Sequence, residues 1–174
     1  TYPNPGDSGL AVGAALYAYY QAKPDEPIHA IEDLYWGGSF SDVEIEEVLK
    51  LRHLDYRRVE NIEEWTAQQL AEDKIVGWFQ GRAEMGPRAL GNRSILSDAR
   101  DNKIKDLINA KIKHREAFRP FAPVVLLERA QEFFEVTQPD PFMTLAPRIH
   151  PDKLHLIPAA AHVDGTGRIQ TIER

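Results

Sequence analysis

The spacing of apolar and polar residues along the chain predicts five helices separated by short strands and turns. The segments with helical patterns are residues 9–21, 41–51, 61–71, 101–113 and 128–134. Short polar residues stand where several of these helices should begin, because their side chains can accept hydrogen bonds from the first backbone N–H groups. They are Asp7 or Ser8 for the first helix, Ser41 with Glu44 for the second, Asn61 with Glu64 for the third, and Asp101 for the fourth.

Apolar side chains recur three or four positions apart in the middle three segments, so each of these helices should bury one face. The side chains expected to face inward are Val43, Ile45, Val48 and Leu49, then Ile62, Trp65 and Leu70, and then Ile104, Leu107, Ile108 and Ile112. The first segment is instead rich in alanine and glycine, which predicts close packing against a neighbouring element.

Short runs of β-branched and aromatic residues predict strands between the helices. The expected strands are residues 56–59, 74–80 (a buried strand), 94–97, 121–127 and 142–145, and a hairpin of 159–163 with 168–172. Asp164 and Gly165 stand at the tip of that hairpin, where an Asp-Gly pair favours a tight turn. Strands and helices alternate irregularly, which favours an α/β fold with a mixed, twisted sheet and flanking helices over regular parallel βαβ units.

The length of 174 residues is typical of one medium-sized domain, and the chain contains no cysteine. Disulfides and thiolate metal sites are therefore excluded. No stretch approaches the roughly 18 apolar residues of a membrane span, and the N-terminus has no signal-peptide pattern. We therefore expect a cytoplasmic protein without a membrane partner.

The charges of the chain are unevenly distributed. The whole chain has 21 basic and 27 acidic residues, for a net charge of −6. Between Arg82 and Arg119, ten basic and five acidic residues give a net charge of +5, which leaves −11 on the remainder. A basic segment in an acidic chain predicts a local anion site and argues against a general nucleic-acid binder. For Lys103, Lys105 and Lys111 the simpler interpretation is a solvated helix surface.

The most informative stretch is the loop at residues 81–94, Gly-Arg-Ala-Glu-Met-Gly-Pro-Arg-Ala-Leu-Gly-Asn-Arg-Ser. Glycine lets backbone N–H groups approach an anion, and the guanidinium groups of Arg88 and Arg93 can each bind phosphate or carboxylate with two hydrogen bonds. The loop matches neither the Walker pattern nor the dinucleotide fingerprint. The alternative is a structural turn whose arginines pair with acidic neighbours.

A second basic segment lies at residues 113–121, Lys-His-Arg-Glu-Ala-Phe-Arg-Pro-Phe. Lys113 and Arg119 could bind a phosphate while Phe118 or Phe121 covers a base. Alternatively, Lys113 and Arg115 complement the dipole at the C-terminus of a helix. The binding interpretation is stronger for Arg119, which directly precedes a proline.

The sequence offers little support for metal or acyl-enzyme chemistry. The six histidines are scattered, and His150 and His155 lie in a proline-containing loop that would not present one ligand face. There is no GxSxG motif and no cysteine nucleophile, so acyl-enzyme hydrolysis is not indicated.

Three blocks of the chain resemble the signature of one enzyme family. They are residues 77–95, 108–123 and 157–170. The first contains Gly-Arg-Ala-Glu-Met-Gly-Pro-Arg-Ala-Leu-Gly, the second Lys-His-Arg-Glu-Ala-Phe-Arg-Pro, and the third His-Val-Asp-Gly-Thr-Gly-Arg. In this order they are similar to the NodU/CmcH-type O-carbamoyltransferases, and the resemblance extends over nearly the whole chain.

The resemblance implies two domains. An actin-like, metal-binding domain transfers the carbamoyl group to a hydroxyl of an acceptor, such as a natural product, a sugar or a nodulation factor. A YrdC-like α/β domain makes carbamoyl-adenylate from carbamoyl phosphate and ATP. Residues 1–23 are then expected to be the tail of the actin-like domain, residues 24–36 a linker, and residues 37–174 the YrdC-like domain.

The resemblance also implies a set of site residues. The cations that bind the nucleotide and carbamoyl phosphate are Arg88, Arg93, Lys113, Arg119 and Arg168, of which Lys113 and Arg119 are expected to be catalytic. Asp7 corresponds to an iron ligand whose partner ligands are absent from this chain. The chain ends before a family segment, Asn-Thr-Ser-Phe-Asn, that helps to form the pocket, so we expect a piece truncated at both ends.

Two alternatives remain at the level of sequence. The first is a YrdC-like nucleotide- or RNA-binding module without carbamoyl transfer. It would require a long basic stripe for RNA, which the acidic remainder disfavours. The second is a folded segment that has no ligand affinity of its own.

Overall fold

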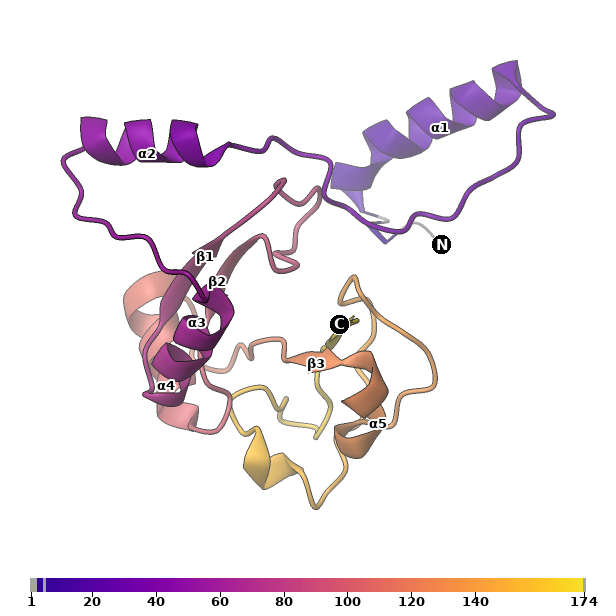
Figure 1. Cartoon of the computed structure of the whole chain (residues 1–174). Coiled ribbons are helices and arrows are strands. Elements are labelled where there is room, and N and C mark those ends of the chain that lie inside the picture. Colours follow the sequence, from indigo (N-terminus) through magenta and orange to yellow (C-terminus); the bar gives the residue numbers. More distant parts are fainter. Residues whose placement is uncertain (1–2, 5, 174) are drawn as a thin grey trace.

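Short helices and strands alternate in the computed structural model, which describes residues 3–4 and 6–173 (Figure 1). The α-helices are α1 (Leu10–Ala22), α2 (Asp42–Leu51), α3 (Ile62–Ala71), α4 (Asn102–Ile108) and α5 (Ala130–Phe133). The strands are β1 (Val76–Phe79), β2 (Arg93–Leu96), β3 (Val124–Leu126) and β4 (Gln170–Ile172). A 3-10 turn, Asp7–Gly9, precedes α1, and a π-helical turn, Asn109–Lys113, extends α4.

The strands form two separate two-stranded sheets in the described residues, where one mixed sheet was expected. Strands β1 and β2 are antiparallel, with Val76 opposite Leu96. Strands β3 and β4 are parallel, with Val124 opposite Gln170. The combination of helices with both strand directions confirms a mixed α/β structure. The predicted extent of the sheet is wrong, because each ladder is only three or four residues long.

Three of the predicted strands are wrong: residues 56–59, 142–145 and 159–163. The second of these forms a turn instead, because the Asp140 carboxylate accepts hydrogen bonds from the backbone N–H groups of Thr144 and Leu145. The predicted Asp-Gly turn does form, since the Asp164 carboxylate accepts a hydrogen bond from the N–H of Thr166 at 3.0 Å. Its two sides do not pair as a hairpin, because the strand that follows the turn pairs with β3.

The predicted starts of three helices are confirmed. Ser41 and Glu44 form a complete capping box at the start of α2. The Asn61 side chain accepts a hydrogen bond from the N–H of Glu64 at the start of α3. The Asp101 side chain caps α4 in the same way. Local sequence was sufficient in these cases because both partners of each bond lie within a few residues.

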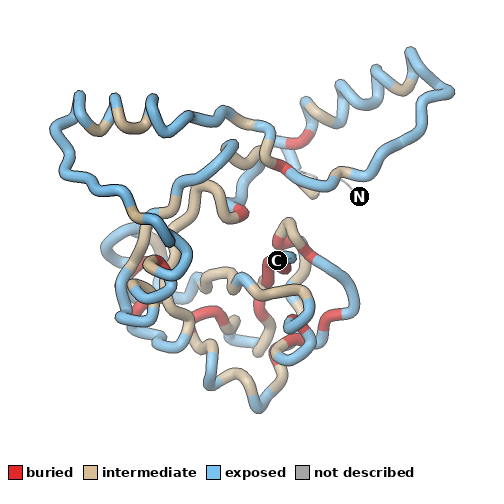
Figure 2. The backbone as a smooth tube through the Cα atoms, viewed as in Figure 1, coloured by how far each residue is buried: buried red, intermediate tan, exposed pale blue. Residues whose placement is uncertain are grey.

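The start and the packing of α1 differ from the prediction. Gly9 is the N-cap and no side chain caps the helix, because the Ser8 hydroxyl is hydrogen-bonded to the Asn4 side chain. Helix α1 projects from the rest of the chain and buries none of its residues, so the expected close packing is wrong (Figures 1 and 2). With 13 residues it does not span a membrane, and no other described helix is long and apolar enough to do so.

Buried side chains gather in three clusters, mostly in the second half of the chain (Figure 2). They are Ala130, Phe134, Val136, Ile149 and Ile169; Leu34, Leu90 and Met143; and Ile104, Ile108 and Ala159. The second cluster joins the segment before α2, the loop between β1 and β2, and the turn at residue 143. It therefore fixes the position of the glycine- and arginine-rich loop.

Several predicted inward faces are exposed. Helix α4 buries Ile104 and Ile108 as expected, but Leu107 and Ile112 are exposed. Ile112 lies in the π-helical turn, whose wider hydrogen-bond spacing rotates it away from the buried face. Also exposed are Val43 and Val48 of α2 and Ile62 of α3. The side chains of β1 are at most half-buried, so the prediction of a buried strand there is wrong.

Candidate anion-binding site

The loop between β1 and β2 is folded around the carboxylate of Glu84. Its Oε1 accepts hydrogen bonds from the backbone N–H groups of Leu90 (2.7 Å), Asn92 (2.8 Å) and Arg93 (3.1 Å). The sharp turns need positive φ angles that favour glycine, and they occur at Gly81, Gly86 and Gly91. Glu84 thus occupies three backbone N–H groups of the loop, which are then not available to a bound anion.

The charge of Glu84 is stabilised by these contacts. Partial burial raises the pKa of the carboxyl, but the hydrogen bonds from the N–H groups of Leu90, Asn92 and Arg93 outweigh it, so the pKa lies below that of an ordinary glutamate. The carboxylate is therefore ionised at neutral pH and holds the loop closed. Anion binding near this loop must come mainly from side chains.

The carbonyl oxygen of Leu90 joins the loop to two other segments. It accepts hydrogen bonds from the Tyr35 hydroxyl (2.9 Å) and from the side-chain N–H of Gln170 (2.8 Å). Leu90 and Gln170 are both buried. Because Gln170 begins β4, the second bond brings the loop that carries Arg88 close to Arg168, which directly precedes that strand.

Arg93 is occupied by the loop itself. Its guanidinium donates hydrogen bonds to the carbonyl oxygens of Gln80 (2.6 Å), Asn92 (2.9 Å) and Gly81 (3.2 Å). It also lies over the ring of Phe79, 3.6 Å from the centroid. The structure therefore places Arg93, a predicted phosphate ligand, where it stabilises the loop. The alternative interpretation expected the arginines of the loop to pair with acidic neighbours, but the hydrogen-bond partners of Arg93 are carbonyl oxygens.

Arg168 is half-buried and lacks a hydrogen-bond partner for its Nε–H in the described part of the chain. Burial lowers the pKa of this guanidinium, and the nearby positive charges of Arg88 and Arg115 lower it further. Arg168 forms no ion pair with a carboxylate among the described residues. The charges of Arg88 and Arg115 both act on Arg168, and none of the three arginines has an ion pair within the described structure, so their guanidinium groups form a candidate anion site.

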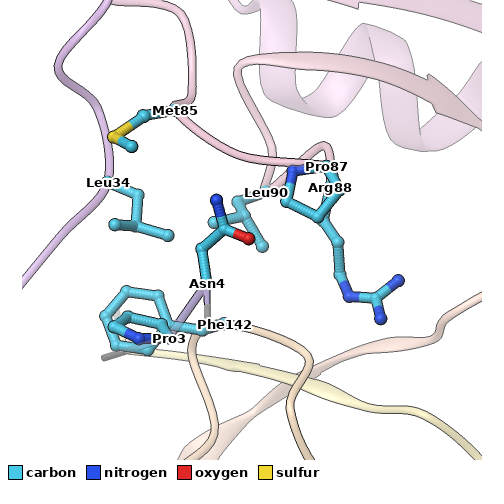
Figure 3. A pocket seen from close by; sticks show the side chains of 8 residues that line it. All are labelled: Pro3, Asn4, Leu34, Met85, Pro87, Arg88, Leu90 and Phe142. Atoms are coloured by element: carbon cyan, nitrogen blue, oxygen red, sulfur yellow. The ribbon is translucent and has the colours of Figure 1, made fainter. Parts of the chain in front are cut away.

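Arg88 borders a small pocket, and its orientation shows where an anion can reach it (Figure 3). The Asn4 side chain points between Leu34 and Leu90, and the Arg88 guanidinium extends away from them. The pocket has a volume of about 20 Å³, which is room for about one water molecule. A phosphate must therefore meet Arg88 at its exposed guanidinium, outside this pocket.

Lys113 and Arg119 lie on the exposed turn after α4. Lys113 ends the π-helical turn, and Arg119 forms an ion pair with Glu116 at 3.0 Å. Phe118 is 71% exposed and remains accessible, whereas Phe121 packs against the cluster of Ile104, Ile108 and Ala159. Only Phe118 of the two aromatic candidates could therefore cover a base.

The structure groups Arg88 with Arg168 and leaves Lys113 and Arg119 on a neighbouring surface turn.

Asp7, the expected iron ligand, is exposed at the start of the 3-10 turn. Within residues 3–4 and 6–173, no three histidine or acidic side chains come together in a way that could hold a metal ion. The described residues therefore do not fit iron on their own, and the role of Asp7 stays a prediction from the family resemblance.

Two residues of this site were missed at the level of sequence. Arg115 was assigned only to a helix dipole, and Glu84 was quoted in the loop without a role. Asn109 gave a weak indication of the role of Arg115. It is a polar residue directly after the apolar Ile108, and a polar side chain that is buried there must find hydrogen-bond partners. No local pattern marks Glu84, since its partners are backbone groups six to nine residues away.

Comparison of the sequence with known proteins identifies the family of the chain. Residues 67–174 match the family model described as carbamoyltransferase C-terminus. Nodulation protein NolO of Bradyrhizobium diazoefficiens is 44% identical over 99% of this chain, which covers 32% of that protein. Nodulation protein NolNO of Sinorhizobium fredii is 43% identical over 99% of the chain, covering 26% of its length. Nodulation protein U of Rhizobium tropici is 37% identical over 99%, covering 28%.

The chain thus spans about a third or less of the length of these curated relatives. The family match includes all three blocks on which the sequence resemblance was based and contains Arg88, Lys113 and Arg168. It also covers more than half of the chain. The chain therefore belongs to the carbamoyltransferase family and carries its C-terminal region.

Proposed function

We propose that this chain is the part of an O-carbamoyltransferase that binds ATP and carbamoyl phosphate and forms carbamoyl-adenylate. The observation that carries the proposal is the half-buried Arg168, whose Nε–H is unpaired in the described structure while the charge of Arg88 lies nearby. Bringing such guanidinium groups together costs free energy, and a bound phosphate offsets that cost with charge-assisted hydrogen bonds. Family membership suggests which phosphates these are.

The proposed reaction begins with carbamoyl phosphate, which water cleaves to carbamate and inorganic phosphate. A carbamate oxygen then forms a bond to the α-phosphorus of ATP, the bond from that phosphorus to the β-bridging oxygen breaks, and pyrophosphate leaves. The carbamoyl group of the resulting carbamoyl-adenylate passes to an acceptor hydroxyl, which loses its proton, and AMP is released. Cations assist the adenylation step by neutralising the phosphate oxygens and holding the reactants in line.

In this proposal Arg88 and Arg168 bind phosphate, and Lys113 and Arg119 stabilise the charge that develops during adenylation. Arg93 supports the site by shaping the loop through its bonds to carbonyl oxygens. We further propose a YrdC-like fold for residues 37–174. No step is assigned to iron or to Asp7, because no three histidine or acidic side chains of the described residues come together to hold a metal ion.

The proposed reaction can be tested by measuring pyrophosphate release from ATP. The chain should release pyrophosphate only when ATP and carbamoyl phosphate are both present. Lys113→Gln should lower the rate about 100-fold, as expected when a charge that stabilises the transition state is removed. Lys103→Gln, at an exposed position in α4, is the matched control and should leave the rate unchanged. Formation of ADP in place of pyrophosphate would contradict adenylation.

Glu116 is expected to compete with substrate for Arg119. Because the two form an exposed ion pair at 3.0 Å, Glu116→Gln should free the guanidinium and tighten ATP binding about twofold to fivefold. Stability should change little, since exposed ion pairs contribute little. The control is Glu132→Gln, which removes an ion pair of the same spacing with Arg129. Calorimetric titration with ATP measures both variants, and equal affinities would show that Arg119 does not contact the nucleotide.

A further inference from the structure

Asn109 is a fully buried polar residue at the start of the π-helical turn, and the hydrogen bonds of its side chain all go to the turn that follows. Its side-chain N–H groups donate to the carbonyl oxygens of Ala117 (3.4 Å) and Arg119 (2.9 Å). The backbone carbonyl oxygen of Asn109 accepts hydrogen bonds from the backbone N–H groups of His114 and Arg115. His114 has a φ of +47°, which reverses the chain at this point. Asn109 therefore fixes the course of residues 114–119 through both its side chain and its backbone carbonyl.

The same Asn109 side chain also orients Arg115. Its Oδ1 accepts a hydrogen bond from the Arg115 Nε–H at 2.7 Å. On its face, the Arg115 guanidinium lies over the ring of Phe121, 4.8 Å from the centroid, and Phe121 is itself held in the core. The Nε–H of Arg115 is hydrogen-bonded and one face of its guanidinium is covered, so its two terminal nitrogens are held at a defined position, where no other described residue binds them.

The terminal nitrogens of Arg115 have no carboxylate partner among the described residues, although Glu116 is the next residue in the chain. The Glu116 carboxylate pairs with Arg119 instead. Arg115 is near enough to Arg168 for its charge to act on that guanidinium. An arginine held in place by a buried amide and an aromatic ring, yet left without a counter-ion, has the features of a preorganised ligand for an anion.

We propose that Arg115 is a third phosphate ligand of the Arg88 and Arg168 site, and that Asn109 is the residue that positions it. The proposal rests on the proposed function, because it assigns further residues to the same site. Three guanidinium groups suit a group with two or more negative charges, such as the linked phosphates of a nucleotide or of pyrophosphate. A π-helical turn at this point is consistent with a functional role, because such turns occur frequently at functional sites.

The test is calorimetric titration of the chain with inorganic pyrophosphate at fixed ionic strength. Arg115→Gln should raise the Kd about tenfold to hundredfold, as expected for the loss of charge-assisted hydrogen bonds. Asn109→Ala should raise it by a similar factor, and the double variant should bind no more weakly than Arg115→Gln alone. Arg52→Gln removes the same charge at an exposed position after α2 and should leave the Kd nearly unchanged. Arg115→Lys, which keeps the charge without the planar fork, should be intermediate.

The possible outcomes separate the two proposals. One outcome would be that the chain binds pyrophosphate, that Arg168→Met weakens this binding, and that Arg115→Gln does not. This outcome overturns the role of Arg115, while the proposed function stands. If the effects of Asn109→Ala and Arg115→Gln multiply in the double variant, Asn109 does not act through Arg115. Should Asn109→Ala fail to fold, the Arg115 variants still decide whether Arg115 is a ligand. If the unmodified chain does not bind pyrophosphate, the proposed function itself fails.

Discussion

Replacing Arg168 by methionine is expected to weaken ATP binding about tenfold to hundredfold without destabilising the free chain. The guanidinium makes charge-assisted hydrogen bonds to phosphate in our proposal, and such bonds contribute about 1.5–3 kcal/mol each. Its Nε–H is buried and finds no partner among residues 3–4 and 6–173, and the charges of Arg88 and Arg115 act on it. Methionine is unbranched and apolar, so it removes both the unpaired buried N–H group and the repulsion between the positive charges. Thermal stability should therefore stay level or rise.

Two measurements on the same samples check this expectation. Calorimetry gives the affinity for ATP, and thermal unfolding gives the stability with and without the nucleotide. ATP should raise the unfolding temperature of the original chain and leave that of Arg168→Met almost unchanged. Arg52→Met, at an exposed arginine just after α2, should behave like the original chain. A large loss of stability in Arg168→Met with normal ATP affinity would mean that Arg168 is purely structural.

Replacing Glu84 by glutamine is expected to lower the free energy of unfolding by about 1–3 kcal/mol at neutral pH. The ionised carboxylate accepts three backbone hydrogen bonds, and a neutral amide oxygen accepts them about half as strongly. The loop also holds Arg88 and Leu90, so ATP affinity should fall together with stability. Urea denaturation measures the first effect and calorimetry the second, with Glu47→Gln as an exposed control in α2.

The effect of Glu84→Gln should depend on pH in a defined direction. The pKa of Glu84 is lowered in the folded chain, so the stability it contributes is present above the pKa of an unfolded glutamate and is lost as the pH falls through the folded pKa. The difference in stability between the original chain and Glu84→Gln should therefore be largest near pH 7 and shrink below about pH 4. A difference that stays constant over this range would show that the charge of Glu84 does not hold the loop.

The features predicted correctly from sequence are those determined by near neighbours in the chain. The capping contacts of Ser41, Asn61 and Asp101 join residues two or three positions apart, and the turn at Asp164 does the same. The basic loop and Arg88 were selected as site candidates because glycine and arginine are dense there, and their role in binding stays a prediction. Arg168 was reached only through the family resemblance.

The features that were missed depend on partners distant in sequence. Strand β4 pairs with β3 across more than 40 residues, and nothing in the Asp-Gly turn indicates that choice. Arg93 and Arg115 look equivalent in the sequence, yet the Arg93 guanidinium binds carbonyl oxygens of its own loop, whereas the terminal nitrogens of Arg115 have no hydrogen-bond partner in the part of the chain that the structure describes. The π-helical turn after α4 decides the second case, and periodicity alone predicts a continuous α-helix through Ile112.

The shared phosphate site is tested most directly by NMR of the arginine side-chain Nε–H groups in the 15N-labelled chain. The Nε–H signal of Arg168, identified by its loss in Arg168→Met, should be visible because the group is buried. We predict that this signal and that of Arg115 shift together as ATP is added and stop shifting at one equivalent, and that Arg88→Gln weakens the response. If both signals stay unchanged at saturating ATP, Arg88, Arg115 and Arg168 do not form a phosphate site.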